Sequence, residues 1–330
     1  MFPNRLKTRR ICVMSRNQVV AALSGLIVIC LSVQSLRAAT PTTYCRFQAG
    51  DRVAYGIVEG EHVRELAGSL FGDFSKTNKM HVLKEVTLLV PSEPSHVFAM
   101  AGNYKSHLGG GTTTKTITTT TTIVNDPKTG KTTTATKTTE EVRVSGKIPP
   151  KFQIPQPFFK SPSCLVRHEG NIVIPRGAEE VHYEAEMVIV IGREAANVSQ
   201  QDALDYVLGV TIGNDVSARR WQKSDVQWWR AKGADTFGPC GPFIVSGVNY
   251  DDLLLQLRLN GTTVQKERTS QLIHGVAETV ASISQHITLR AGDLIFTGTS
   301  GTTDSIQPGD EIEVELEGVG ILRNRVVADQ

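Results

Sequence analysis

The chain has 330 residues, of which 40% are hydrophobic and 21% are charged, a composition typical of a globular protein that buries a sizeable core. The formal net charge is +2, but residues 1–39 hold six basic and no acidic side chains, so the remainder carries 2 − 6 = −4. That remainder has no Lys/Arg-rich stripe and no nucleic-acid motif. We therefore expect no nucleic-acid partner.

The N-terminus has the layout of a secretory signal peptide. Several basic residues precede an uncharged apolar run at residues 19–33, which is followed by a pair of alanines at 38–39. The run is shorter than the roughly 20 residues that span a bilayer. We expect residues 1–39 to direct export and to be cleaved, leaving no stable membrane span. An uncleaved anchor, or a mispredicted start and a cytoplasmic protein, are the alternatives.

The next segment predicts a small β-rich domain at residues 44–95. Short β-type runs such as residues 52–58 alternate there with Gly and charged turns, and the segment ends at Pro91 and Pro94. Residues 97–102 then form a short apolar strand that leads into Asn103 and His107. Loops at strand exits commonly carry polar chemistry.

A threonine-rich insertion, bounded here as residues 110–143, interrupts the larger domain that we assign to residues 96–330. More than half of residues 112–139 are threonine. Such low complexity suggests disorder, yet threonine is β-branched and turn-forming residues stand midway, so a protruding β-hairpin is equally consistent. We expect no chemistry from this segment.

Strand patterns dominate the rest of the chain. They occur at residues 187–191, 243–245, 253–259, 293–296 and 311–316. Helical spacing of apolar residues is confined to residues 200–206 and 270–287. These patterns predict a mixed α/β, β-rich fold.

Three carboxylates form the most informative pattern. Glu184 and Glu186 are two residues apart at the start of a predicted strand, so their side chains share one face. Asp215 ends a second strand-like run and supplies a third carboxylate. Three carboxylates without cysteine suit a hard divalent cation such as Mg²⁺ or Mn²⁺.

Several segments together resemble the fumarylacetoacetate hydrolase family in their order and spacing. The matching residues are Gly102 to Tyr104 with His107, Phe159 to Ser163, Tyr183 to Glu186, Gly209 with Asn214 to Arg219, Lys232 with Asp235 to Pro239, and Thr297 to Thr299. The resemblance covers roughly residues 44–107 and 148–327. The individual motifs are short, and their combination is specific.

The resemblance implies a fold, an assembly and a set of roles. The fold would be the family's mixed β-roll, assembled as a homodimer or higher oligomer that acts on a small carboxylate substrate. Glu184, Glu186 and Asp215 would bind one Mg²⁺ or Mn²⁺ ion. Lys232 would hold a developing oxyanion and Lys160 would support the site. The substrate-binding positions would be Tyr104, Arg219, Gln222 and Thr299.

The chain departs from the family pattern beside His107. In hydrolytic members this histidine is paired with a glutamate three residues later, and the two activate water. Here that position is Gly110, and Glu140 or Glu141, which follow the threonine-rich residues 112–139, are the carboxylates that could replace the glutamate in space. General-base catalysis is typically worth ~10²–10⁴-fold in rate, and a histidine without an orienting carboxylate loses part of it.

The leading hypothesis is hydrolysis of a C–C bond in an acylpyruvate-like 1,3-dicarbonyl acid, with His107 as the base. The alternative is isomerisation of a 2-hydroxy-dienedioate or decarboxylation of oxaloacetate at the same metal site, neither of which needs an attacking water. A third hypothesis is a carboxylate-binding protein without turnover. Specificity depends on loops around the distal end of the ligand.

Overall fold

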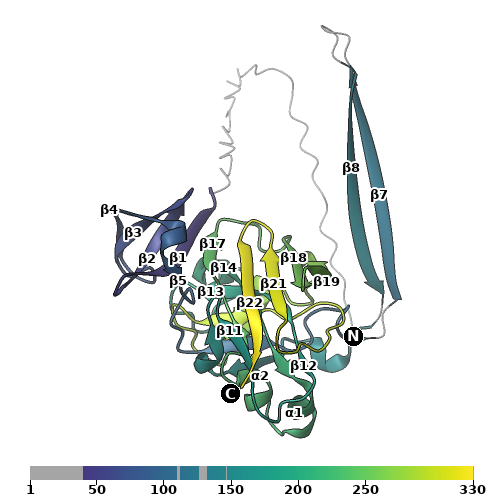
Figure 1. The fold of residues 1–330 in the computed structure, drawn as a ribbon. Coiled ribbons are helices and arrows are strands. Elements are labelled where there is room, and N and C mark those ends of the chain that lie inside the picture. The colour runs from purple at the N-terminus through teal and green to yellow at the C-terminus, as the bar shows by residue number, and fades with distance from the viewer. Residues whose placement is uncertain (1–39, 110–111, 126–131, 146, 330) are drawn as a thin grey trace, which may run out of the picture. The chain divides into compact units, whose positions relative to one another are not determined.

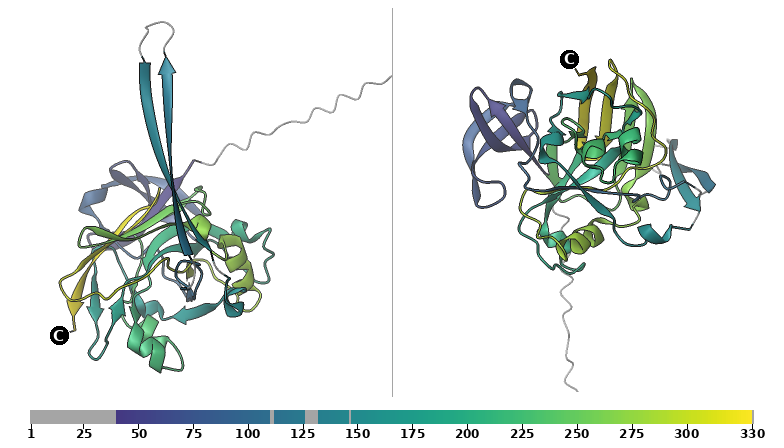
Figure 2. Two further views of the ribbon diagram at one scale, coloured as in Figure 1. Left: turned by 90° about the vertical axis from the view of Figure 1, so that its right-hand side faces the viewer. Right: turned by 90° about the horizontal axis from the view of Figure 1, so that it is seen from below.

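The computed structural model describes residues 40–329, except 110–111, 126–131 and 146. The predicted signal segment and Gly110 therefore lie outside the described residues. Figures 1 and 2 show strands over most of the described chain and only short helices. Within that part, no helix is long and apolar enough to cross a membrane.

The larger sheet contains eleven strands. Its members are β1 (Thr42–Ala49), β2 (Arg52–Glu59), β3 (His62–Gly68), β4 (Phe74–Val82), β5 (Thr87–Leu88), β6 (Val97–Met100), β9 (Pro157–Lys160), β13 (Ala185–Ile191), β14 (Val207–Asn214), β17 (Phe243–Ser246) and β20 (Leu294–Phe296). The strand order is β4-β3-β2-β1-β17-β14-β13-β20-β6-β9, with β5 paired to β1. The N-terminal strands therefore continue into the strands that follow residue 96.

A second sheet has the order β11-β22-β21-β18-β19. Its strands are β11 (Asn171–Ile174), β18 (Leu254–Leu259), β19 (Thr262–Arg268), β21 (Glu311–Leu316) and β22 (Gly320–Ala328). Two short pairs complete the body, β10 (Leu165–Val166) with β16 (Gly238–Pro239) and β12 (Val181–His182) with β15 (Ser217–Ala218). The α-helices are α1 (Arg219–Ser224), α2 (Trp229–Gly233) and α3 (Val276–Ser284).

Strand β13 lies at the centre of the core. All seven of its residues are buried. Met187, Ile189 and Ile191 pack into a cluster that includes apolar residues of β18, β21 and β22. Val188 and Val190 face the opposite way and pack against residues of β6 and β20. Because strand side chains alternate between faces, Glu186 shares the face of Val188.

The strand predictions at residues 187–191, 243–245, 253–259, 293–296 and 311–316 correspond to β13, β17, β18, β20 and β21. The helical predictions were too long. Residues 200–206 contain only the 3₁₀ turn η4 (Ala203–Tyr206), and residues 270–287 contain the shorter α3. In this region Gly275 precedes the helix, and residues 269–271 form the 3₁₀ turn η5 (Thr269–Gln271).

The threonine-rich segment forms a hairpin of β7 (Thr112–Asn125) and β8 (Thr132–Ser145) (Figure 1). Thr112 pairs with Ser145, and Asn125 pairs with Thr132, so the register is regular from end to end. The two strands form a sheet of their own among the described strands. The insertion thus begins and ends at neighbouring positions of the backbone.

We predict that replacing Thr112 to Ser145 by a short Gly linker leaves the fold intact. The paired ends are already close, and loop-closure entropy changes by only about 0.6 kcal/mol per doubling of loop length. Stability should fall by no more than about 1 kcal/mol, measured by urea unfolding. Failure to obtain folded protein would show that the hairpin supports the body.

Candidate functional site

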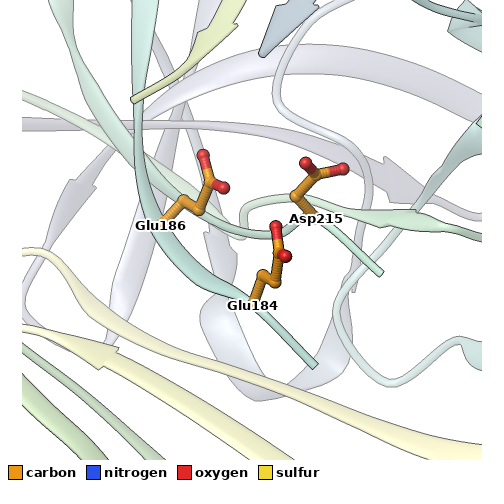
Figure 3. A group of neighbouring side chains, drawn as sticks. All are labelled: Glu184, Glu186 and Asp215. Carbon is orange, nitrogen blue, oxygen red and sulfur yellow. The ribbon is translucent and has the colours of Figure 1, made fainter. Parts of the chain in front are cut away.

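The three carboxylates converge because of the pairing between β13 and β14. Ala185 pairs with Asn214, so Glu184 stands opposite Asp215, whose backbone N–H donates to the Glu184 carbonyl at 2.8 Å. Glu186 lies two residues beyond Glu184 on the same face. The three side chains point toward one another (Figure 3), and one oxygen from each lies within 4.8 Å of the others.

Burial of three carboxylates requires compensating charge, and three cationic side chains supply it. The Lys232 ammonium lies 2.7 Å from both Glu184 Oε2 and Asp215 Oδ2. Arg219 Nη2 lies 2.6 Å from Glu184 Oε1. Lys160 Nζ lies 2.6 Å from Asp215 Oδ1 and also donates to the backbone carbonyls of Lys232 and Phe237.

The pKa values of the two glutamates move in opposite directions. Burial would raise the pKa of Glu184, but the charges of Lys232 and Arg219 outweigh it and lower the pKa to about 2. Burial and the charges of Asp215 and Glu184 raise the pKa of Glu186 well above its usual value. Glu186 is therefore the carboxylate whose negative charge is least compensated.

The backbone after β20 completes the surroundings of Glu186. The N–H of Gly298 donates to Glu186 Oε2 at 2.6 Å. Gly298 has a φ of +98°, and a Cβ there would lie 2.8 Å from the Cβ of Asn103, so a glycine is required. An all-oxygen site with one undercompensated carboxylate fits a hard divalent cation, which would relieve the repulsion within the trio.

A pocket of about 160 Å³ adjoins the carboxylates. Its polar lining consists of His107, Glu184, Arg219, Gln222, Lys232 and Thr299. Apolar side chains, including Leu108, Phe152 and Trp228, make up much of the remaining wall. The structure thus places most of the predicted substrate and catalytic residues around one small cavity.

Tyr104 is an exception to this convergence. Its side chain is fully buried, is not among the residues that line the pocket, and its hydroxyl has no hydrogen-bond partner among the described residues. Burial raises the pKa of Tyr104 strongly, with smaller contributions from the charges of Glu267 and Glu186. Tyr104 therefore does not line this pocket, and its role in substrate binding stays a prediction.

Arg219 and Gln222 lie on one turn of α1 and contact each other. Arg219 Nη1 donates to Gln222 Oε1 at 2.9 Å, and Arg219 Nη2 donates to Thr303 Oγ1 at 2.7 Å. Since Arg219 also pairs with Glu184, its guanidinium is held from three sides. Arg219 can therefore hold the carboxylate of Glu184 and the side chain of Gln222 in fixed positions at the pocket.

His107 is held in one tautomer. Its Nδ1 lies 2.8 Å from the carbonyl oxygen of Gly301, and a carbonyl can only accept, so Nδ1 carries the proton. In the neutral ring the other nitrogen, Nε2, is then an acceptor. A histidine in this state is suited to take up a proton.

Polar residues of β19 support the site and were missed by sequence reasoning. Gln265 is buried, and its amide donates to Thr299 Oγ1 at 2.9 Å and to the Ser300 carbonyl at 2.6 Å. Its Oε1 accepts the N–H of Ala185 at 3.0 Å. Because the Thr299 hydroxyl accepts from Gln265, its own proton is free to donate elsewhere. No local signal marks Gln265 and Glu267, because Lys266 between them is polar as well.

Two protein-family models match most of the chain. Residues 130–327 match the model described as fumarylacetoacetate (FAA) hydrolase C-terminal, and residues 43–91 match the Rv2993c-like N-terminal model. Protein Rv2993c of Mycobacterium tuberculosis is 36% identical over 292 residues, covering 86% of this chain and 97% of that protein.

Two solved structures show the same fold over nearly their whole length. The 2-hydroxyhepta-2,4-diene-1,7-dioate isomerase from Mycobacterium marinum is 36% identical, with a TM-score of 0.71, covering 87% of this chain and 99% of that chain. The 5-carboxymethyl-2-hydroxymuconate delta-isomerase from Mycobacterium smegmatis is 33% identical, with a TM-score of 0.71, covering 87% and 100%. The chain therefore belongs to the fumarylacetoacetate hydrolase family of enzymes.

Proposed function

We propose that this protein is a metal-dependent isomerase of 2-hydroxy-2,4-dienedioates, with Glu184, Glu186 and Asp215 as the ligands of one Mg²⁺ or Mn²⁺ ion. In this reaction the 2-hydroxyl loses its proton and C5 gains one, while the two double bonds at C2 and C4 become a 2-oxo group and one double bond at C3. No bond between heavy atoms breaks. A divalent cation in the carboxylate site would supply a Lewis acid for the carboxylate and 2-oxygen of such an acid.

The state of His107 is the observation that carries the proposal. Its Nδ1–H donates to a peptide carbonyl at 2.8 Å rather than to a carboxylate. The proton on Nδ1 is held by that carbonyl, so Nε2 is the nitrogen that can accept a proton. Moving a proton between the oxygen and carbon of a dienol requires one such acceptor and no attacking water.

The remaining pocket residues have complementary roles toward the diacid. The free Thr299 hydroxyl proton and the Gln222 side chain provide hydrogen bonds for substrate oxygens. The Lys232 ammonium, which lies 2.7 Å from two of the carboxylates, stabilises negative charge that develops on the 2-oxygen. The isomerase names of the two structures at 33% and 36% identity support the same reaction class.

Hydrolysis of an acylpyruvate-like acid is the second candidate. His107 and Lys232 line the same cavity, so a water beside Nε2 would be close to a bound 2-oxo acid. The same base would then deprotonate water, and a C–C bond would break to release pyruvate. Product analysis separates the two reactions, since only hydrolysis fragments the substrate.

We predict that Glu186→Gln weakens Mn²⁺ binding by at least about tenfold, because loss of even a supporting partner of a metal ligand typically costs 10–100-fold. Titration calorimetry of the metal-free protein provides the measurement. Glu61→Gln, which changes an exposed glutamate far from this trio in sequence, is the matched control. Unchanged affinity in Glu186→Gln would remove Glu186 from the ligand set.

We predict that the enzyme with Mg²⁺ or Mn²⁺ converts a 2-hydroxy-2,4-dienedioate with loss of dienol absorbance and without release of pyruvate. His107→Ala should lower kcat by about 10²–10⁴-fold, the usual general-base factor, while metal affinity stays unchanged. His62→Ala, an exposed histidine of β3, is the control. Release of pyruvate from an acylpyruvate instead would favour hydrolysis, and a near-wild-type His107→Ala enzyme would exclude His107 as the base.

A further inference from the structure

We infer that Glu267, which does not contact the imidazole, positions His107 through Ser106 and the backbone of Gly301. The inference rests on the proposed role of His107 as a base. It assigns Glu267 and Ser106 as positioning residues, because neither is among the residues that line the pocket. The series Glu267, Ser106, Gly301 and His107 is called the Glu267 bridge below.

The Glu267 bridge is continuous at hydrogen-bond distances. Ser106 Oγ donates to Glu267 Oε2 at 2.7 Å. The backbone N–H of Gly301 donates to Ser106 Oγ at 3.0 Å, and the Gly301 carbonyl accepts from His107 Nδ1 at 2.8 Å. A carboxylate begins the series and an imidazole ends it.

The direction of each bond in the series is determined by chemistry. An ionised carboxylate can only accept, so the Ser106 hydroxyl gives its single proton to Glu267. The lone pairs of Ser106 then accept the Gly301 N–H. The Gly301 carbonyl can only accept, which places a proton on His107 Nδ1. Glu267 and Ser106 therefore act by holding the Gly301 backbone in place, and the Gly301 carbonyl selects the tautomer in which Nε2 is the acceptor.

Gly301 joins the two halves of the bridge through its backbone. Its φ is +60°, the left-handed region, and a Cβ there would have no neighbour within 4 Å. A glycine is favoured at this position by backbone conformation and not by lack of space. In this conformation its N–H reaches Ser106 while its carbonyl reaches His107.

The series also joins three separate segments of the chain. Ser106 and His107 belong to the loop after β6, Gly301 to the loop after β20, and Glu267 to β19. Gln265 lies two residues before Glu267 and holds Thr299 and Ser300 on the same loop as Gly301. One face of β19 therefore contacts both loops that line the pocket. Gln265 holds the loop after β20, and Glu267 contacts Ser106, the residue before His107, in the loop after β6.

A role in positioning predicts a defined kinetic pattern. Glu267→Ala and Ser106→Ala should each lower kcat about tenfold or more, a part of the general-base factor of ~10²–10⁴, with KM and Mn²⁺ affinity nearly unchanged. Glu267→Gln keeps an acceptor for Ser106 and should recover most of the loss. Lys266→Ala, an exposed neighbour on the other face of β19, should behave as wild type.

Double variants test whether the residues act through His107. The effects of Glu267→Ala and Ser106→Ala should not multiply, and Glu267→Ala should cause no further loss in a His107→Ala background. Multiplicative losses, or a change confined to KM, would overturn the inference. Thermal unfolding of each variant identifies any that fail to fold, and Glu267→Gln then provides the comparison.

A measurement that does not depend on turnover separates this inference from the proposed function. Long-range ¹H–¹⁵N spectra of ¹⁵N-histidine-labelled protein report the tautomer of His107, assigned by its absence in His107→Ala. Wild type and Glu267→Gln should show the Nδ1–H form, and Glu267→Ala and Ser106→Ala a mixture. An unchanged tautomer in both Ala variants would refute the Glu267 bridge even in an active enzyme. The expected change would support it even if no dienedioate is isomerised.

Discussion

The placement of three carboxylates within 4.8 Å of one another in a buried site is the constraint on which the rest of the site depends. Buried negative charge of this density is unfavourable unless cations are close by. Lys160, Lys232 and Arg219 come from three different elements, yet each contacts one or two of the carboxylates. The strand and the two short helices that carry these cations are thereby held around the trio.

The three carboxylates do not share the positive charge around them equally. Glu184 and Asp215 have ammonium or guanidinium partners, whereas the hydrogen bond that Glu186 accepts among the described residues comes from a backbone N–H. The burial of an undercompensated carboxylate stores free energy that a bound cation releases. Arg219 and Lys232, two of the cations that stabilise the trio, also line the pocket, so the same side chains balance the buried carboxylates and give the cavity positive charge.

Strand alternation and strand exits indicated the carboxylate trio, whereas the resemblance to the family indicated the pocket residues His107, Lys232, Arg219, Gln222 and Thr299. Glu184 and Glu186 are two residues apart, so strand alternation places them on one face, and Asp215 directly follows a neighbouring strand. The burial of Tyr104 could not be predicted in this way, since a motif identifies a residue without stating what covers it.

Gln265 and Glu267 were missed, because β19 is a largely exposed edge strand that lacks an apolar alternation. Their partners Thr299 and Ser106 are 34 and 161 residues away, and no local pattern reports such contacts. The predicted export and oligomerisation stay predictions.

The pairing of β6 with β20 has a consequence for the order in which the molecule is made. These strands run parallel, with Val97 beside Leu294, so β20 enters the sheet only after most of the chain has been synthesised. The loop after β20 supplies Gly298, Thr299 and Gly301, and the loop after β6 supplies His107. Contacts between segments so distant in sequence form slowly, because the intervening chain must first be ordered. The pocket is therefore complete only once β20 has joined the sheet, although Glu184, Glu186 and Asp215 all precede β20 in the chain.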